Sequence, residues 1–286
     1  MEVFFIRKAI CLVLVLLSLL SINTLAAPAQ VEGYTIPVDI TINDHFIKTI
    51  QKPFIENNNV YVPLRSFADA ISAEVVWNHE EQCATMLKYH FTFNFYAETG
   101  ICVFNGVEDP AGAPIVYNDT LFITMDFVCY WLGYGITWNS FYYIYEIFAP
   151  DIVVPETCKD YSYTKNDLLW LAKIVHTECG AEPVRTRIGI SNTVVNRVRS
   201  PLYPNNIPAA ILDTKHGVQY PPAHLAKFNR TPSLSSMVAA KCALNGVELV
   251  GNSVAFVHVN AFAKSWAANN MRHYTTLGVV GFFTFD

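Results

Sequence analysis

The hydrophobic and polar positions divide the chain into regions of different pattern. Between residues 33 and 148, short apolar stretches alternate with turns that contain Asn, Asp or Gly. This pattern is typical of strands with a few short helices. From Thr164 onward the apolar residues recur at helical spacing. Residues 149–163 contain two prolines and show no clear period. The pattern predicts an α+β protein in which a linker joins two domains.

The first 29 residues have the features of a signal peptide. Arg7 and Lys8 precede an apolar run over residues 9–20, and Ala27 and Ala29 offer small residues for cleavage. The run is shorter than the roughly 20 apolar residues that span a bilayer, and no later stretch is long enough. An uncleaved N-terminal anchor is the alternative. The pattern favours export, with no membrane span after signal cleavage.

Two segments of the first region can be superposed at an offset of 61 residues. Pro53–Asn78 and Pro114–Asn139 each read as strand, Asn-containing turn, short strand, helix and a strand that carries a tryptophan. The predicted helices are Leu64–Ile71 and Met125–Leu132. A short strand-like piece with Asn at its turn precedes each copy. Residues 30–148 are therefore expected to form a small α+β module built from two repeats.

The first copy contains Tyr61-Val62-Pro63-Leu64-Arg65, and this repeat resembles the copper amine oxidase N-terminal-like domain. In the second copy Thr124 and Asp126 stand where the first has Pro and Arg. Such modules are often attached to exported bacterial enzymes. Despite the name no metal site follows, because the histidines of this region are scattered along it. We expect a packed scaffold without chemistry, whose partner would be a wall polymer or another protein.

The second region opens with two predicted helices. Thr164 and Asp167 have the form of a capping box, and the first helix runs to about Glu178–Cys179. Gly180 supplies its stop. A second helix is expected over residues 183–198, with a proline in its first turn.

Two carboxylates flank the break between these helices. Glu178 is at the C-terminal end of the first, where the helix dipole disfavours negative charge, and partial burial would raise its pKa further. Glu182 precedes the second helix, whose N-terminal end favours the ionised form. Such a pair supplies one proton donor and one group that stays charged, as in lysozyme. From its position alone, Glu178 could instead be a solvated residue at a frayed helix end.

The sequence around Glu178 resembles the cell wall hydrolase family that includes the spore cortex-lytic enzymes of the SleB and CwlJ type. The shared stretches run in the family's order from about residue 165 to residue 286. They are Ala172–Pro183, Ile188–Val198, Tyr203–Ile207, Gly217–Pro222, Ala243–Gly246, Phe256–Asn260 with Lys264–Trp266, and Gly281–Phe285. The resemblance implies that residues 164–286 form a mostly helical, lysozyme-like domain with a small β-sheet. The family's catalytic glutamate falls on Glu178.

The resemblance also implies a reaction. The family cleaves peptidoglycan glycan strands between N-acetylmuramic acid and N-acetylglucosamine, typically as lytic transglycosylases that leave 1,6-anhydromuramic ends. Glu178 would act first as the acid and then as the base, and Glu182 would support the site. No cofactor or metal is implied. The expected location is secreted and associated with the cell wall, and spore cortex and vegetative wall both stay open as substrates.

Four further residues are expected to bind the sugar. Gln219 and Tyr220 form a hydrogen-bonding and stacking pair, and Asn260 and Trp266 form the opposite wall. Aromatic faces pack well against sugar rings, and amides hydrogen-bond to N-acetyl groups. Each residue also has a plain structural alternative, since a tryptophan can belong to the core and an asparagine to a turn.

The chain departs from the family at three single positions and in the unusual stretch Pro221–His224 that follows Gln219 and Tyr220. His176 stands where a tyrosine is common, Cys179 where an alanine is usual, and Phe283 where many members carry histidine. These changes leave open an altered substrate preference or a weakened activity. A non-catalytic wall-binding protein is therefore one alternative. A wall peptidase that uses Cys179 is a weaker one, because this residue follows a helix end where nothing lowers the pKa of a thiol.

Charge and cysteine content limit the remaining classes. The formal net charge of −5 argues against nucleic acid as a partner, which would require a basic face. Six cysteines follow the signal peptide at irregular spacing without a C-x-x-C pair. Free thiols are favoured, and disulfides stay open because the protein is expected to be exported. No histidine and cysteine spacing is that of a zinc site.

Overall fold

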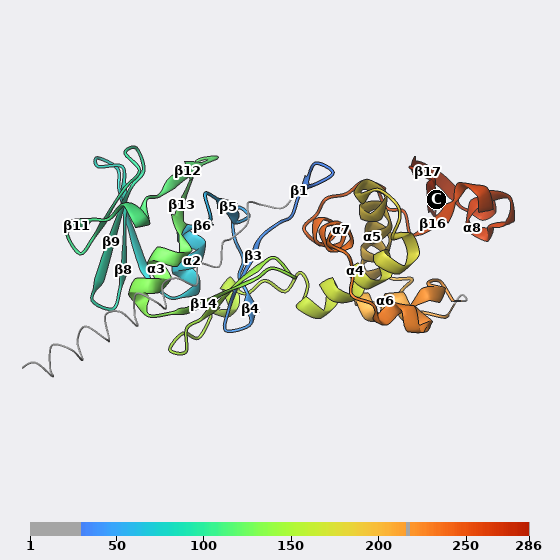
Figure 1. Ribbon diagram of the computed structural model, residues 1–286, viewed down its shortest axis with the longest axis horizontal. Helices are drawn as coiled ribbons and strands as arrows, with labels where there is room; N and C mark the ends of the chain where they lie inside the picture. The colour runs from blue at the N-terminus through green and yellow to red at the C-terminus, as the bar shows by residue number, and fades with distance from the viewer. Residues whose placement is uncertain (1–29, 216–217, 286) are drawn as a thin grey trace, which may run out of the picture.

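The computed structural model describes residues 30–215 and 218–285. The predicted signal peptide over residues 1–29 lies outside the described residues. Strands fill the N-terminal half of the described chain and helices dominate the C-terminal half, as the blue-green and yellow-red parts of Figure 1 show. The protein therefore belongs to the α+β class, with a sheet-rich module followed by a mostly helical domain.

The two repeats form equivalent elements 61 residues apart. The first consists of β5 (Phe54–Glu56), β6 (Asn59–Pro63), α2 (Leu64–Ala70) and β7 (Glu74–Asn78). The second consists of β12 (Ile115–Tyr117), β13 (Thr120–Thr124), α3 (Met125–Leu132) and β14 (Gly135–Asn139). Both predicted helices are present, and α2 ends one residue earlier than expected. The repeat seen in the sequence is therefore a repeat of structure.

The two copies meet in a four-stranded sheet of order β12-β13-β6-β5. At its centre β6 and β13 are antiparallel, with Val62 opposite Ile123. These two residues occupy the same position in the two copies. The copies are therefore related by a local two-fold axis through this pair.

Each copy also contributes to a sheet of its own. One has the order β11-β10-β9-β8-β7 and the other the order β4-β3-β15-β14. The further strands are β3 (Asp39–Ile42), β4 (His45–Phe46), β8 (Cys83–Lys88), β9 (Phe91–Tyr96), β10 (Ile101–Phe104), β11 (Val107–Glu108) and β15 (Ile144–Phe148). The five-stranded sheet differs from the four-stranded one by an additional strand, β9, which lies between β8 and β10 and is antiparallel to both. In the four-stranded sheet β15 and β3 pair directly and are parallel. A short 3₁₀ turn, η1 (Pro110–Gly112), follows β11.

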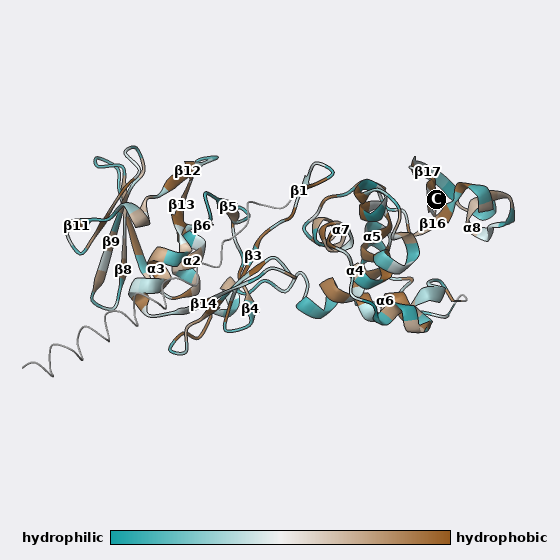
Figure 2. Cartoon of the chain, viewed as in Figure 1, coloured by the Kyte–Doolittle hydropathy of each residue, from teal (hydrophilic) through white to brown (hydrophobic). Residues whose placement is uncertain are grey.

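Asparagine stands at the hairpin turns, as the sequence predicts. Asn43, Asn57, Asn105 and Asn118 have φ between 46° and 48°, and the residue after each also has positive φ. Two consecutive positive φ angles characterise the type I′ turn, which suits the twist of a tight hairpin and favours Asn and Gly. Figure 2 shows hydrophobic residues along β3 and β13, within the core that these turns close.

The helical domain begins with the two predicted helices. α4 (Lys165–Cys179) starts with the expected capping box, in which the amide of Asp167 donates to Thr164 Oγ1 at 3.1 Å and the amide of Thr164 donates to Asp167 Oδ2 at 2.9 Å. α5 (Val184–Arg199) follows after a short turn. α7 (Leu234–Leu244) packs against both, and α6 (Ile207–Leu212) lies beside them. Leu168, Leu171, Ile188 and other apolar residues of these helices form one core.

The end of α4 differs from expectation in one respect. Gly180 has φ −59° and ψ −10°, which is right-handed rather than the left-handed conformation of a usual glycine stop. Glycine is needed here for a close approach, because a Cβ at this position would lie 2.5 Å from the carbonyl oxygen of His176.

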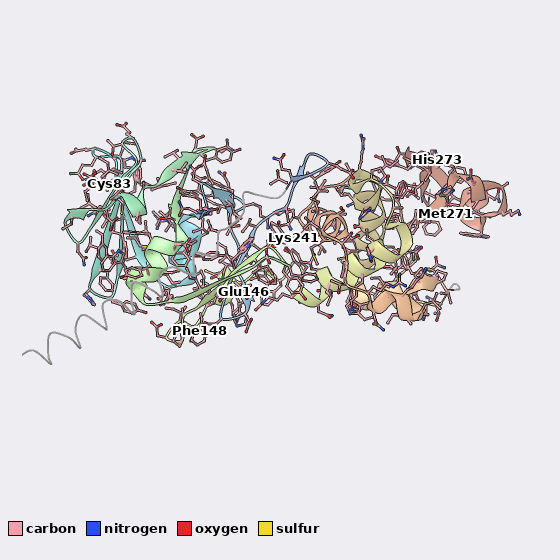
Figure 3. The ribbon with its side chains drawn as sticks, viewed as in Figure 1. Cys83, Glu146, Phe148, Lys241, Met271 and His273 are labelled. Carbon is pink, nitrogen blue, oxygen red and sulfur yellow. The ribbon has the colours of Figure 1, made fainter. Side chains whose placement is uncertain are left out.

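The C-terminal segment adds a small antiparallel sheet of order β16-β18-β17. Its elements are β16 (Ala255–His258), β17 (Arg272–Leu277) and β18 (Val280–Thr284), with α8 (Trp266–Asn270) between the first two strands. Short 3₁₀ turns complete the domain: η3 (Pro221–His224), η4 (Ala226–Asn229) and η5 (Val259–Lys264). Figure 3 labels Met271 and His273 in this part.

The two halves are in direct contact. β1 (Gln30–Val31) and β2 (Tyr34–Thr35) form a hairpin that packs on α7, and Ile36 lies in the core of the helical domain. Between the halves, the chain includes η2 (Glu156–Cys158), while Ile152 and Val154 are buried in the core of the module. The first part of the predicted linker is therefore packed into the module, and the N-terminal hairpin holds the module to the helical domain.

Candidate functional site

Glu178 lies in the last turn of α4, and its carboxyl group is largely withdrawn from solvent. Oε1 is buried and has no hydrogen-bond partner among the described residues. Burial raises the pKa of Glu178 to about 7, and the opposing charge of Lys227 lowers it by a smaller amount. Desolvation penalises the ionised form, which explains the direction of the change. The group can therefore hold a proton near neutral pH.

A cavity of about 410 Å³ opens beside Glu178. A second cavity of about 550 Å³ shares five lining residues with it, so the two are parts of one groove. The shared residues are Arg197, Gln219, Ala255, Trp266 and Ala267. Cavities of about 620 and 660 Å³ lie elsewhere, so the choice of this groove rests on the chemistry of Glu178 rather than on volume.

The groove is assembled from distant parts of the chain. Glu178 comes from α4, Arg197 from α5, and Phe256 and Val257 from β16. Trp266 begins α8, where the Ser265 hydroxyl caps the helix by accepting a hydrogen bond from the Ala268 amide at 3.4 Å. The small C-terminal sheet and α8 thus form one wall opposite the end of α4.

Two of the predicted sugar-binding residues lie in the groove. Trp266 lines both parts and its side chain is 66% exposed, so an aromatic face is available to a ligand. Gln219 also lines both parts, and its Oε1 accepts a hydrogen bond from Arg197 Nη2 at 3.1 Å. The structure thus brings Glu178, Gln219 and Trp266 together, although they are distant in the sequence.

The other two predicted sugar-binding residues lie elsewhere. Tyr220 is completely buried, with its ring 4.8 Å from the guanidinium of Arg197, so it cannot stack on a sugar in this conformation. It belongs to the core beneath the groove. Asn260 is exposed on η5 and is not among the residues that line either cavity. The backbone amide of Asn260 donates to His258 Nδ1 at 3.3 Å, so this residue takes part in a local turn.

Glu182 does not line the groove either. Its carboxylate lies on the side of Gly278, with Oε2 3.5 Å from the position that a Cβ would take there. Its carbonyl oxygen accepts from Arg187 Nε at 2.7 Å, and the same guanidinium donates to the carbonyl oxygen of Gly180 at 2.7 Å. Glu182 therefore contributes to the turn after α4 through its backbone rather than through a carboxylate beside Glu178.

The expected acidic group at the start of α5 comes from another part of the chain. The amide of Val184, the first residue of α5, donates to Glu32 Oε2 at 2.7 Å. Glu32 lies in the turn between β1 and β2. A carboxylate at a helix N-terminus is favourable, and here it ties the N-terminal hairpin to the helical domain.

Arg187 and Arg197 are the polar residues that the sequence reasoning missed. Both are in α5 and both are nearly buried, at 7% and 4% exposure. Arg187 binds the turn that follows Glu178, and Arg197 lines the groove. Their position on the apolar face of α5 could have identified them in the sequence. A charged side chain on the packed face of a helix requires polar partners.

Cys179 is not suited to nucleophilic chemistry. It is buried, its Sγ donates to the carbonyl oxygen of Val175 at 3.1 Å, and burial raises the pKa of its thiol to about 12. A thiol with this pKa is not ionised at neutral pH. All six cysteines within the described residues are free, and five of them are buried.

The neighbouring His176 has its pKa lowered, chiefly by burial. The described residues hold no group of three or more His, Cys, Asp or Glu side chains placed to bind a metal ion. His216 lies outside those residues. Within the same part of the chain, no helix is long and apolar enough to cross a bilayer.

Known families match both halves of the chain. Residues 41–147 match the Copper amine oxidase N-terminal domain, and residues 181–283 match the Cell Wall Hydrolase family. The second match begins three residues after Glu178, so the case for this residue rests on its geometry.

Curated relatives and solved structures each resemble part of the chain. Spore cortex-lytic enzymes of Bacillus cereus and Halalkalibacterium halodurans are each 23% identical over 104 residues, which is 36% of this chain. The match spans 39% and 31% of those relatives, so the chain covers about two fifths of their length or less.

Two solved structures are also similar, at 22% identity and a TM-score of 0.39 each. The catalytic domain of the Bacillus cereus SleB protein is covered to 92% by 43% of this chain. The catalytic domain of a germination-specific lytic transglycosylase, SleB from Bacillus anthracis, is covered completely by 46% of this chain.

Proposed function

We propose that this chain, whose C-terminal half carries a domain of the cell wall hydrolase family, cleaves peptidoglycan glycan strands in the groove beside Glu178. The observation that carries the proposal is the buried carboxyl of Glu178, with a pKa near 7 and an Oε1 that has no partner among the described residues. A carboxylic acid that keeps its proton near neutrality is the group required to protonate a glycosidic oxygen.

The reaction we propose is lytic transglycosylation. Glu178 donates its proton to the oxygen that links N-acetylmuramic acid to N-acetylglucosamine, and the bond from that oxygen to muramoyl C1 breaks. The resulting carboxylate then takes the proton of the muramoyl C6 hydroxyl, whose oxygen bonds to C1. One new end is a 1,6-anhydromuramic residue, the other is a free hydroxyl, and Glu178 regains its proton.

A single carboxyl group suits this sequence of steps. Among the described residues that line the cavity around Glu178, it is the one carboxylic acid. Hydrolysis by the usual two-carboxylate route needs a second acid roughly 5–9.5 Å away. Asp213 lines the neighbouring part of the groove, and Glu182 lies outside it. This distribution favours attack by the substrate's own hydroxyl over attack by water.

We infer two roles beside the chemistry. Trp266 offers its exposed ring to a sugar face, and Gln219 presents a side-chain amide to a polar substituent. The N-terminal module supports the helical domain through direct contacts, and a wall polymer is the partner we propose for its outer surface. The proposed location is the exterior of the cell, on the wall or the spore cortex.

The test is mass spectrometry of fragments released from purified cortex and from vegetative peptidoglycan. We expect products that end in 1,6-anhydromuramic acid with the unaltered protein, and none with Glu178→Gln. Glu182→Gln is the matched control and should remain active, because its carboxylate lies outside the groove.

Other products would point elsewhere. Reducing sugar ends would mean that water is the nucleophile. Cleaved stem peptides would indicate a peptidase that uses Cys179. Binding without any product, unchanged by Glu178→Gln, would mean that the domain is a wall-binding protein. Activity lost in EDTA and restored by zinc would contradict a metal-free mechanism.

A further inference from the structure

Arg197 is the cationic residue shared by the two parts of the groove. It lies near the end of α5, lines both parts of the groove, and is 4% exposed. Its Nε donates to the carbonyl oxygen of Val254 at 2.7 Å, and its Nη2 donates to Gln219 Oε1 at 3.1 Å. Two of its nitrogens are thereby fixed by the protein, which holds the guanidinium plane in place.

The third nitrogen is unused. Nη1 is buried and has no hydrogen-bond partner among the described residues. Arginine carries its charge at all ordinary pH values and has five donor hydrogens in a rigid plane. An unpaired donor of a buried cation is costly, so it calls for an acceptor that the described residues do not provide.

Arg197 shares the groove with the carboxyl groups of Glu178 and Asp213 but forms an ion pair with neither. Within the described residues, no Asp or Glu oxygen lies within ion-pair distance of its guanidinium. The rings of Tyr203 and Tyr220 lie 5.1 and 4.8 Å from it, and both are neutral because burial raises the pKa of each phenol. Aromatic faces stabilise a cation but do not neutralise it. The groove therefore contains a preformed positive site.

We propose that Arg197 determines specificity by binding a carboxylate of the glycan that occupies the groove. The inference rests on the proposed function, because it assumes that a peptidoglycan strand is the ligand. A carboxylate matches both the spare donor and the uncompensated charge, and charge-assisted hydrogen bonds are the stronger class. Neutral N-acetyl oxygens would satisfy the donor alone.

Two parts of peptidoglycan carry such a group. One is the lactyl side chain of a muramic residue that has lost its peptide, and the other is a carboxylate of an attached stem peptide. Muramic-δ-lactam offers neither, because the lactyl carboxyl is consumed in the ring amide. The proposal therefore predicts that the residue seated beside Arg197 is a muramic unit that has not been converted to the lactam.

Binding should be measured by calorimetry with full-length Glu178→Gln protein, which should hold the strand without cleaving it. The ligands are stem-free glycan of one length, the same glycan with its lactyl carboxyls converted to amides, and glycan that retains its stems. We expect amidation to weaken binding by about tenfold or more. In Glu178→Gln/Arg197→Gln the charged and amidated glycans should bind within about twofold of each other.

Amidation compares two ligands on one protein, so it remains informative if Arg197→Gln fails to fold. Arg197→Lys keeps the charge and provides the second variant, with the preference reduced but present. Tighter binding of the stem-bearing glycan would assign the carboxylate to the peptide, and tighter binding of the stem-free glycan would assign it to the lactyl group.

Equal affinity for charged and amidated glycans would overturn the proposal for Arg197. So would an Arg197→Gln loss of the same size for both ligands, since that would indicate a purely structural residue. Failure of the proposed function would look different, because the unaltered protein would then cleave no glycan of any kind, whatever the charge of the glycan.

Discussion

The ammonium group of Lys241 lies 2.9 Å from the carboxylate of Asp39, and both side chains are buried. Lys241, labelled in Figure 3, belongs to α7 and Asp39 belongs to β3. The ion pair therefore crosses from the helical domain to the module. Lys241 also donates to the carbonyl oxygens of Pro37 at 2.7 Å and Tyr143 at 2.6 Å, and Asp39 accepts from the hydroxyl of Tyr163. The two halves therefore share one buried polar cluster.

Removing one member of this pair should destabilise the whole protein. In Lys241→Met the carboxylate of Asp39 loses its buried countercharge and keeps only the more exposed Lys52, whose ammonium is 3.5 Å away. The expected loss is roughly 3–5 kcal/mol of unfolding free energy. Asp39→Asn/Lys241→Met should recover most of that loss, because the remaining group is neutral and still accepts from Tyr163. Urea unfolding of the three proteins measures the difference.

Lys165→Met is the matched control. Lys165 pairs with Glu146 at 2.8 Å, also between the two halves, but these side chains are 30% and 27% exposed. We expect a loss of about 1 kcal/mol or less. A similar loss of unfolding free energy for Lys165→Met and Lys241→Met would show that burial does not make the Asp39–Lys241 pair more important for stability than the exposed pair.

Glu178→Gln should stabilise the protein in alkaline solution. The unfolded chain releases this proton near the ordinary pKa of 4.5, whereas the folded protein holds it up to about pH 7. Folding is therefore favoured by this proton below pH 4.5, and that contribution is lost as pH rises to 7. Because Gln cannot ionise, the variant should be more stable than the unaltered protein by up to about 3 kcal/mol above pH 7.

The difference between the two proteins should vanish near pH 4, which serves as the internal control. Thermal unfolding from pH 4 to pH 8 measures it. In the active protein, kcat/KM should fall as pH rises through about 7, because the acid form of Glu178 is then lost. A stability difference that does not depend on pH would contradict the raised pKa.

Cys179→Ala should have an activity of the same order as that of the unaltered protein. The thiol is buried, bonded to Val175 and not ionised at neutral pH, so the reaction does not use it. The folded protein should also resist iodoacetamide at this position, as peptide mass mapping would show. Abolished turnover in a variant with unaltered circular dichroism would instead establish the thiol as a reacting group.

Trp266→Ala should weaken substrate binding more than it affects folding. The ring is 66% exposed and lines both parts of the groove, so its removal costs few core contacts. We expect KM to rise by about tenfold, which corresponds to ~1.4 kcal/mol, with little change in Tm. Phe148→Ala is the control, because this ring is 64% exposed on the module. Equal effects of the two substitutions on KM would contradict a role for Trp266 in the groove.

Much of the local structure could be predicted from the sequence. The 61-residue offset places the two equivalent helices, Asn marks the tight turns, and Thr164 with Asp167 marks the start of α4. These features depend on residues close together in the chain, whose turn and capping preferences are local. The position of Glu178 at the end of α4 follows from the same kind of information.

The contents of the groove could not be predicted in that way. Gln219 and Tyr220 are adjacent in the sequence, yet Gln219 lines the groove and Tyr220 is completely buried. Trp266 lies in the groove and Asn260 does not, although both belong to the same resembling segment. Which of two neighbouring side chains faces a ligand depends on how their segment packs against distant helices and strands.

The repeat, the helix ends and the position of the acid at the end of α4 follow from the amino-acid sequence alone, because near neighbours in the chain decide these features. The tertiary structure sets how acidic that group is, since its pKa depends on burial within the folded chain and on the charge of Lys227, which is distant in sequence. It also decided that Arg197 meets the groove and that Lys241 meets Asp39, 202 positions apart in the chain. Desolvation and charge pairing act through space, and the folded chain sets those distances.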